Sequence, residues 1–121
     1  METAYEQVLA KVKAGDRLRT PDRRTGKPFV VEALDPEGIR VRTSSGGRVR
    51  MSSFTFDTAV KYLSDFGCRG EKWLAAGDDS FQTVLNIEND RVRAASYVLA
   101  ILGAAEVLDV DGNRPNRVRL R

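Results

Sequence analysis

Two short segments alternate strictly between arginine and other residues, and this alternation restricts the fold more than any other feature. The segments are Ile-Arg-Val-Arg-Thr at 39–43 and Arg-Val-Arg-Met at 48–51. A period of two places the apolar side chains on one face of a β-sheet and the charged side chains on the other. With serines and glycines between them, the two segments predict a β-hairpin that has one buried face and one arginine face.

The alternation also limits the register of this hairpin, because side chains that oppose each other share a face. A loop of two or four residues would place an arginine opposite Val49. A three-residue loop, Ser45-Gly46-Gly47, would pair Val41 with Met51 and would supply the glycine that such loops need. We predict this register. It places four arginines on one solvent face, namely Arg40, Arg42, Arg48 and Arg50.

The first 53 residues predict one helix followed by a β-meander. Thr3 and Glu6 form a capping box, and the helical spacing continues over 4–14. Strands are then expected near 17–20 and 29–34, followed by a Pro-containing turn and the hairpin. The neighbouring strand carries Glu32, which could neutralise one arginine of the hairpin face.

Residues 54–121 predict three helices and a second hairpin. A helix over 54–66 begins after Ser52 or Ser53, and a short helix follows near residue 80, capped by Asp79 or Ser80. A last helix over 91–103, capped by Asn89 or Asp90, is apolar almost all round, which is typical of a central helix. Strands over 106–110 and 117–121 follow, and we expect Trp73-Leu74 to enter the core.

The predicted fold class is therefore α+β. An N-terminal helix and an antiparallel meander (residues 1–53) pack on a helical lobe with a C-terminal hairpin (54–121). At 121 residues the chain suits a single domain, and no flexible linker separates the two lobes.

Composition argues against several classes of function. The chain has no histidine and one cysteine, so it lacks the commonest general base and the usual ligands of a structural zinc site. We expect a non-catalytic protein without a cofactor or metal. The sequence has neither a signal-peptide pattern at its start nor an apolar run that would span a membrane, so we expect a cytoplasmic location.

Positive charge falls into two separate regions. Arginine accounts for 15 of the 20 basic residues, an excess that suits phosphate contacts but that GC-rich coding would also produce. Residues 15–52 carry a net charge of +4, residues 53–90 a net charge of −4, and residues 91–121 a net charge of +3. This order predicts two basic surfaces separated by an acidic one.

The C-terminal half resembles the winged-helix DNA-binding superfamily over about residues 54–121. The resemblance rests on the order of three helices and a hairpin, with Ser96–Leu102 in the last helix and Arg114-Pro115 in the hairpin turn. It implies that the last helix enters the major groove and that the hairpin contacts the phosphate backbone. A helix that recognises base edges needs an exposed polar face. In this helix only Arg91, Arg93 and Ser96 could form such a face.

These observations leave two hypotheses for the function. The first is an accessory or regulatory domain that binds duplex DNA mainly through contacts between arginines and phosphates. Its candidate residues are Arg40, Arg42, Arg48, Arg50, Arg91, Arg93, Arg114, Arg117, Arg119 and Arg121. For the arginines of each hairpin, the alternative is that they are merely solvated and discourage the pairing of exposed strand edges with other chains.

The second hypothesis is a protein-interaction adaptor, such as a phage or defence-system component. It would engage a partner or a second copy of the chain through a patch near Phe66–Trp73, without nucleic acid. Placement of the two basic segments on one side of the molecule would favour the first hypothesis, and placement on opposite sides would favour the second.

Overall fold

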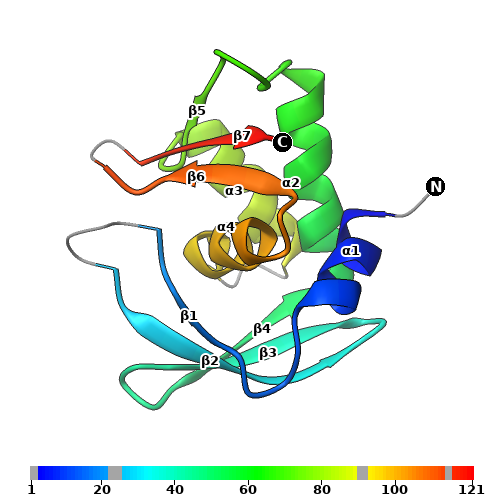
Figure 1. Cartoon of the computed structure of the whole chain (residues 1–121), viewed down its shortest axis with the longest axis vertical. Coiled ribbons are helices and arrows are strands. Elements are labelled where there is room, and N and C mark those ends of the chain that lie inside the picture. Colours follow the sequence, from blue (N-terminus) through cyan, green and yellow to red (C-terminus); the bar gives the residue numbers. More distant parts are fainter. Residues whose placement is uncertain (1–2, 22–25, 90–92, 114–115) are drawn as a thin grey trace.

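The computed structural model describes residues 3–21, 26–89, 93–113 and 116–121. Over these residues the chain forms four helices and seven strands, which confirms the α+β class (Figure 1). The first half contains α1 (Ala4–Lys11), β1 (Arg17–Arg19), β2 (Pro28–Asp35), β3 (Gly38–Thr43) and β4 (Arg48–Ser52). The second half contains α2 (Ser53–Asp65), β5 (Leu74–Ala75), α3 (Asp79–Glu88), α4 (Ala95–Ala104), β6 (Leu108–Asp111) and β7 (Arg117–Leu120).

The strands form two antiparallel sheets, and α4 lies between them (Figure 1). Sheet A has the order β1-β2-β3-β4, and sheet B has the order β5-β7-β6. On one side of α4, the ring of Tyr97 meets the ring of Phe29 in sheet A edge-on, with 5.0 Å between the centroids. On the other side, Gly103 lies so close to β6 that a Cβ atom there would be 3.0 Å from Val110 Cγ2. The central position predicted for this helix is therefore confirmed.

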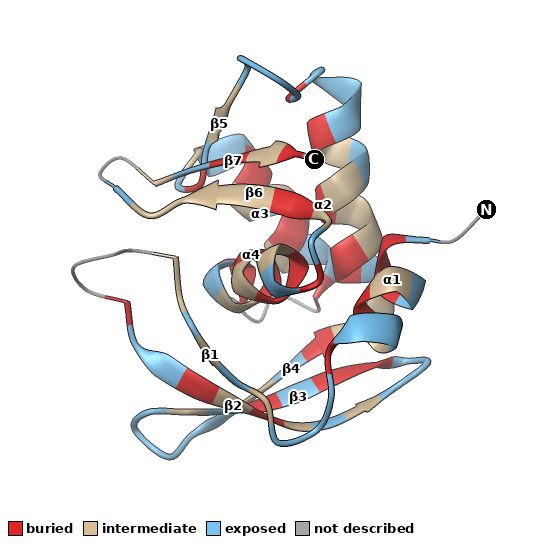
Figure 2. Cartoon of the chain, viewed as in Figure 1, coloured by how far each residue is buried: buried red, intermediate tan, exposed pale blue. Residues whose placement is uncertain are grey.

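The inner face of sheet A contributes one side of the hydrophobic core. Phe29, Val31, Ile39, Val41 and Met51 are all buried there, and buried residues alternate with exposed ones along the strands (Figure 2). The same cluster of buried side chains includes residues of α2, α4 and β7. The two halves of the chain therefore share one core.

The predicted hairpin register is wrong by two residues, although the predicted faces are correct. Arg42 pairs with Arg48 and Val41 pairs with Val49. The loop has three residues as expected, but it begins one residue earlier, because Gly46 and not Gly47 takes the left-handed conformation, with φ +92°. The Gly46 N–H donates to Thr43 O, and the Thr43 N–H donates to Gly47 O. Since a shift of two preserves the alternation, the arginines still face outward.

Two predicted helix boundaries also differ from the structure. α1 ends at Lys11 and not at residue 14, because Val12 is already extended and the chain turns at Gly15, whose φ is +96°. α3 is capped one residue earlier than expected, where the Asp78 carboxylate accepts the N–H of Phe81. The predicted cap of α2 is confirmed, since the Ser52 hydroxyl accepts the N–H of Thr55.

Asn89 does not cap α4, which begins after Ala94. It ends α3, and its carboxamide lies against the edge of β4. There it accepts the N–H of Ser52 and donates to the carbonyl oxygen of Arg50. One buried side chain thus makes the pair of hydrogen bonds that an adjacent strand would make.

Trp73 does not enter the core. It is only partly buried, and its indole lies beneath the guanidinium groups of Arg117 and Arg119, whose Cζ atoms are 5.0 and 4.2 Å from the ring centroid. Leu74, by contrast, packs against the core and begins β5. Among the described residues, no helix is both long enough and apolar enough to span a membrane.

Candidate nucleic-acid interface

The outer face of sheet A is the most strongly charged surface that the strand register defines. Arg17 pairs with Val30, Val30 with Arg42, and Arg42 with Arg48, so one row of outward side chains crosses all four strands. In the row on one side of it, Arg40 pairs with Arg50, and on the other side Arg19 pairs with Pro28. The face is thus defined by its arginines, which are Arg17, Arg19, Arg40, Arg42, Arg48 and Arg50.

A β-bulge in β2 places a single carboxylate among these arginines. Val31 pairs with Val41 and Ala33 pairs with Arg40, which leaves Glu32 as the extra residue between them. A bulge of this kind changes the direction of a side chain, and here both Glu32 and Ala33 lie on the outer side. The Glu32 side chain is 13% exposed because the arginine side chains surround it.

The Glu32 carboxylate contacts three arginines and not the single one that was expected. Its Oε1 lies 2.8 Å from Arg48 Nε and 3.3 Å from Arg40 Nε, and its Oε2 lies 3.2 Å from Arg42 Nη2. The hydrogen bond from Arg48, reinforced by one from Arg42, lowers the pKa of Glu32 from its ordinary value of 4.5. The carboxylate therefore stays ionised, and three guanidinium groups share one negative charge.

The remaining arginines of this face have no carboxylate partner within the described residues. Arg17 and Arg50 make no ion pair there, and the guanidinium group of Arg19 donates to the backbone carbonyl of Gly26. A small hollow of about 100 Å³ lies between Arg40 and Arg50, and its lining also includes Asp35, whose carboxylate accepts the backbone N–H groups of Glu37 and Gly38. The face therefore offers guanidinium donors beside a space large enough for an anionic group.

The arginines of the terminal hairpin are paired with carboxylates. Arg117 lies 2.8 Å from Asp111, and Arg119 lies 3.0 Å from Asp109. Arg121 contacts both Asp109, at 3.0 Å, and Glu106, at 3.7 Å. Hydrogen bonds from Arg119 and Arg117 lower the pKa values of Asp109 and Asp111, respectively. These positive charges are compensated within the hairpin itself.

The two basic segments do not gather on one side of the molecule. The inner face of sheet A packs on α4, so its arginine face points away from that helix. The terminal hairpin packs on the other side of α4 (Figure 1). In the described part of the chain, the arginine face of the sheet and the hairpin arginines therefore lie on opposite sides of α4 (Figure 1), and Arg19 and Arg121 line one cavity between them.

The helix to which the resemblance assigns base reading is covered on both sides. Of the residues in α4, only Ser96 and Ala104 are exposed, and Arg93 is exposed just before its start. Arg91 and Arg114, two other candidate residues, lie outside the described residues. A helix packed in this way offers little polar surface for the edges of bases.

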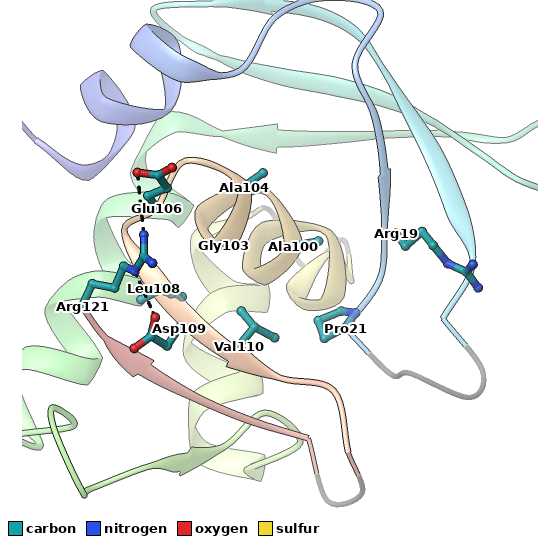
Figure 3. A pocket seen from close by; sticks show the side chains of 10 residues that line it. All are labelled: Arg19, Pro21, Ala100, Gly103, Ala104, Glu106, Leu108, Asp109, Val110 and Arg121. Atoms are coloured by element: carbon teal, nitrogen blue, oxygen red, sulfur yellow. Dashed lines mark hydrogen bonds and ion pairs between the residues drawn. The ribbon is translucent and has the colours of Figure 1, made fainter.

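A cavity of about 450 Å³ separates the end of β1 from α4 and β6 (Figure 3). Its apolar wall consists of Ala100, Gly103, Leu108 and Val110, among others. At its polar end Arg121 forms ion pairs with Glu106 and Asp109, whose other cationic partners are Lys11 and Arg119, whereas the side chain of Arg19 extends away from the cavity (Figure 3). Among the described residues, no three acidic or cysteine side chains come together as ligands for a metal ion.

Three large apolar side chains are exposed on the helices of the second half. Phe54 is 70% exposed, Ile87 is 62% exposed and Phe66 is 53% exposed. The segments that carry Phe54 and Ile87 are neighbours, because Ser52 donates two hydrogen bonds to the end of α3, from its N–H to Asn89 Oδ1 and from its hydroxyl to Glu88 O. Phe66 packs against Tyr62 at the opposite end of α2, with 4.6 Å between the ring centroids.

Comparisons with known proteins add no family to this description. No family model matches the sequence, and neither the curated proteins nor the solved structures contain a match.

Sequence reasoning found four arginines of the sheet face and missed two. Arg17 and Arg19 flank Leu18, which packs against the core, so the same alternation that marked the hairpin was present in β1. The segment Arg-Leu-Arg was too short to establish a face without the register of its partner strand. The bulge at Glu32 has no sequence signal of its own, and so its three contacts could not be predicted.

Proposed function

We propose that the protein binds the phosphate backbone of duplex DNA, without catalysis, through the outer face of sheet A. The observation that carries this proposal is a set of exposed arginines on β1, β3 and β4 whose only ion-pair partner, among the described residues, is Glu32. Such a module would serve an accessory or regulatory role. A chain with one cysteine suits a reducing compartment, and the proposal therefore includes a cytoplasmic location.

The chemistry of this face suits phosphates better than bases. By register, the residues between its arginines are Pro28, Val30 and Ala33, so the described part of the face has no aromatic ring on which a base could stack. Guanidinium groups donate paired hydrogen bonds to phosphate oxygens, and contacts of this kind position a duplex without reading its sequence. We therefore expect binding with little sequence preference.

The proposal differs from what the winged-helix resemblance implies. In that arrangement the last helix and the terminal hairpin make the contacts. Here the hairpin arginines are neutralised by Asp109, Asp111 and Glu106, and α4 lies between the two sheets. The resemblance of residues 54–121 to the winged-helix superfamily remains a proposal that rests on element order, and DNA contact is assigned to sheet A.

The dependence of affinity on salt tests the proposal. For the wild-type protein, log K for a fluorescein-labelled duplex should fall linearly with log salt concentration, at roughly 0.9 per phosphate contacted. The double variant Arg17→Gln/Arg50→Gln removes two guanidinium groups that have no ion pair in the described structure. Its slope should be shallower by roughly 1.8.

A matched control carries the same change of net charge elsewhere. Arg69 and Lys72 are exposed and lie before β5, far from sheet A in the fold. The variant Arg69→Gln/Lys72→Gln should keep the wild-type slope. An equal decrease of the salt slope in both double variants would show that net charge alone governs binding. If the wild-type protein does not bind the duplex at low salt, the proposal is rejected.

The exposed apolar side chains favour a second candidate function, a protein-interaction adaptor. Phe54 and Ile87 are more than half exposed at neighbouring helix ends, and the separation of the two basic segments also agrees with this role. Exposed apolar side chains that cluster often belong to protein interfaces. The simplest partner to test is a second copy of the chain.

Sedimentation over a range of protein concentrations tests this second candidate. A dimer that the double variant Phe54→Asp/Ile87→Asp abolishes, and that Arg40→Gln/Arg42→Gln leaves intact, would support an interface on the helices. A monomer at every concentration would reject self-association through this patch.

A further inference from the structure

We propose that the Glu32 carboxylate occupies, in the free protein, the place that a DNA phosphate takes in the complex. Glu32 thus competes with the ligand for Arg40, Arg42 and Arg48. This inference rests on the proposed function, and it specifies how the affinity of the same site is limited.

A carboxylate and a phosphate make the same demands on a guanidinium group. Both are anions whose oxygens accept hydrogen bonds from arginine N–H groups in a planar, often bidentate, arrangement. Glu32 already accepts from Arg42 and Arg48, with N–O distances of 3.2 and 2.8 Å. These donors cannot give the same hydrogen bonds to a phosphate until the carboxylate moves away.

The bulge makes such a movement feasible. Glu32 is the extra residue of β2, so no residue of β3 pairs with it in the ladder. Its neighbour Ala33 has a small side chain and lines the hollow beside Arg40. Rotation of the Glu32 side chain leaves the backbone register intact, and the small side chain of Ala33 leaves room beside it.

The hollow indicates where a phosphate first contacts the arginines before it displaces the Glu32 carboxylate. It lies between Arg40 and Arg50, with Asp35 on its rim, and a Cβ atom at Gly38 would lie 2.5 Å from Met51 O and 3.3 Å from Arg50 Nη2. Arg40 makes the longest of the three Glu32 contacts, at 3.3 Å, and Arg50 makes no ion pair within the described residues. A phosphate that enters the hollow meets the guanidinium group of Arg50 and that of Arg40, the arginine that Glu32 holds least closely, while Asp35 is engaged by the backbone N–H groups of Glu37 and Gly38.

The arginines of the cluster are accessible to this exchange. Their side chains are 54–59% exposed, whereas the carboxylate that they surround is 13% exposed. Ion pairs between exposed groups are individually weak. A polyanion that contacts several arginines at once can therefore displace one carboxylate.

The test compares Glu32→Gln with the wild type in binding to the labelled duplex. Glutamine keeps the size of the side chain and removes its charge, so the variant should bind roughly 3- to 150-fold more tightly, the range that three exposed ion pairs correspond to. The matched control is Glu37→Gln, which makes the same change of charge in the exposed turn between β2 and β3 and contacts no arginine among the described residues. It should change the affinity less than twofold.

The outcomes separate this inference from the proposed function. Equal gains in Glu32→Gln and Glu37→Gln would show a general charge effect and would overturn the inference. Weaker binding by Glu32→Gln would also overturn it, because the carboxylate would then position the arginines and not compete for them. If neither the wild type nor a variant binds the duplex at low salt, the proposed function itself fails. Glu32→Ala, measured in parallel, provides the same comparison should the glutamine variant fold poorly.

Discussion

At the scale of single residues, Asn89 shows how a side chain can take the place of a strand. Its carboxamide has a donor and an acceptor in the spacing of a peptide group, and it pairs with both Arg50 and Ser52 at the edge of β4. The residue is 5% exposed. Because buried polar groups cost free energy when they lose their partners, this contact should matter for stability.

We expect Asn89→Ala to lower the free energy of unfolding by about 1–3 kcal/mol, since it leaves backbone groups of β4 without partners. Urea unfolding measures the change. Asn86→Ala is the matched control on the same helix, because the buried Oδ1 of Asn86 has no hydrogen-bond partner in the described structure. The control should be close to neutral, and an equal loss in both variants would contradict the role of Asn89.

The raised pKa of Tyr5 predicts how the free energy of unfolding changes at alkaline pH. Its hydroxyl donates to the carbonyl of Asp35, and burial, together with the charge of Asp35, raises its pKa from 10.0 to about 12. Below pH 10.0 the tyrosine is neutral in both states, so the stabilisation is complete. Above that value the unfolded chain ionises first, and the stabilisation is lost as the pH rises through about 12.

The pH dependence of urea unfolding, measured from neutral to strongly alkaline pH, checks this expectation. Tyr5→Phe removes the ionising group and should flatten the alkaline decline, leaving the part that comes from Tyr62, whose pKa burial also raises. An unchanged decline in Tyr5→Phe would contradict the assignment.

At the scale of elements, the hairpin of β3 and β4 shows what alternation can and cannot predict. The period of two correctly assigned every arginine to the outer face. It could not locate the loop, because Gly46 and Gly47 both suit a left-handed position and a shift of two residues preserves the pattern. The position of the loop depends on the backbone hydrogen bonds of Thr43, which the pattern of side chains does not indicate.

Substitution of the two glycines distinguishes the registers. Gly46→Ala should lower the free energy of unfolding by about 1–2 kcal/mol, because an L-residue is strained at φ +92°. Gly47→Ala should change it little, since the new Cβ would lie 3.4 Å from Thr43 Oγ1, at ordinary contact distance. The opposite order of effects in thermal unfolding would support a loop of Ser45-Gly46-Gly47.

The sequence of the terminal hairpin contains a pattern of opposite charges that the net charge of the segment does not show. Asp109 and Asp111 alternate in β6 just as Arg117 and Arg119 alternate in β7, and the register places each aspartate opposite an arginine. Net charge over 91–121 suggested a free basic surface. Pairing the two strands around the turn would have revealed the compensation, whereas the partnership with Trp73 depends on a third strand and could not be predicted.

At the scale of the whole molecule, α4 connects the two sheets. Its apolar circumference correctly predicted a central helix, and the structure shows what lies on its two sides (Figure 1). The sequence could not show that this position separates the two basic segments, because the arrangement of sheets around a helix depends on contacts between distant residues. Tyr97 contacts sheet A, and Gly103 lies against sheet B.

We expect the two halves of the chain to unfold together. Leu99→Ala creates a cavity at a fully packed position of α4 and should lower the free energy of unfolding by about 2–5 kcal/mol. Hydrogen exchange should then show protection falling to the same extent in β3 and in β7. Ser96→Ala, at an exposed position of the same helix, should leave both unchanged.

Separate losses of protection in the two sheets would contradict this expectation and would indicate two independently unfolding lobes. They would also contradict the single domain predicted from the length of the chain.

The place of Trp73 has a practical consequence for spectroscopy. It is the only tryptophan of the chain, and it lies beneath the guanidinium groups of Arg117 and Arg119. Its emission therefore monitors the C-terminal strands and is insensitive to events on the far side of α4. A ligand on the arginine-rich sheet should leave the spectrum unchanged, whereas one that draws the two arginines off the indole should shift it, so an unlabelled titration can locate the contact.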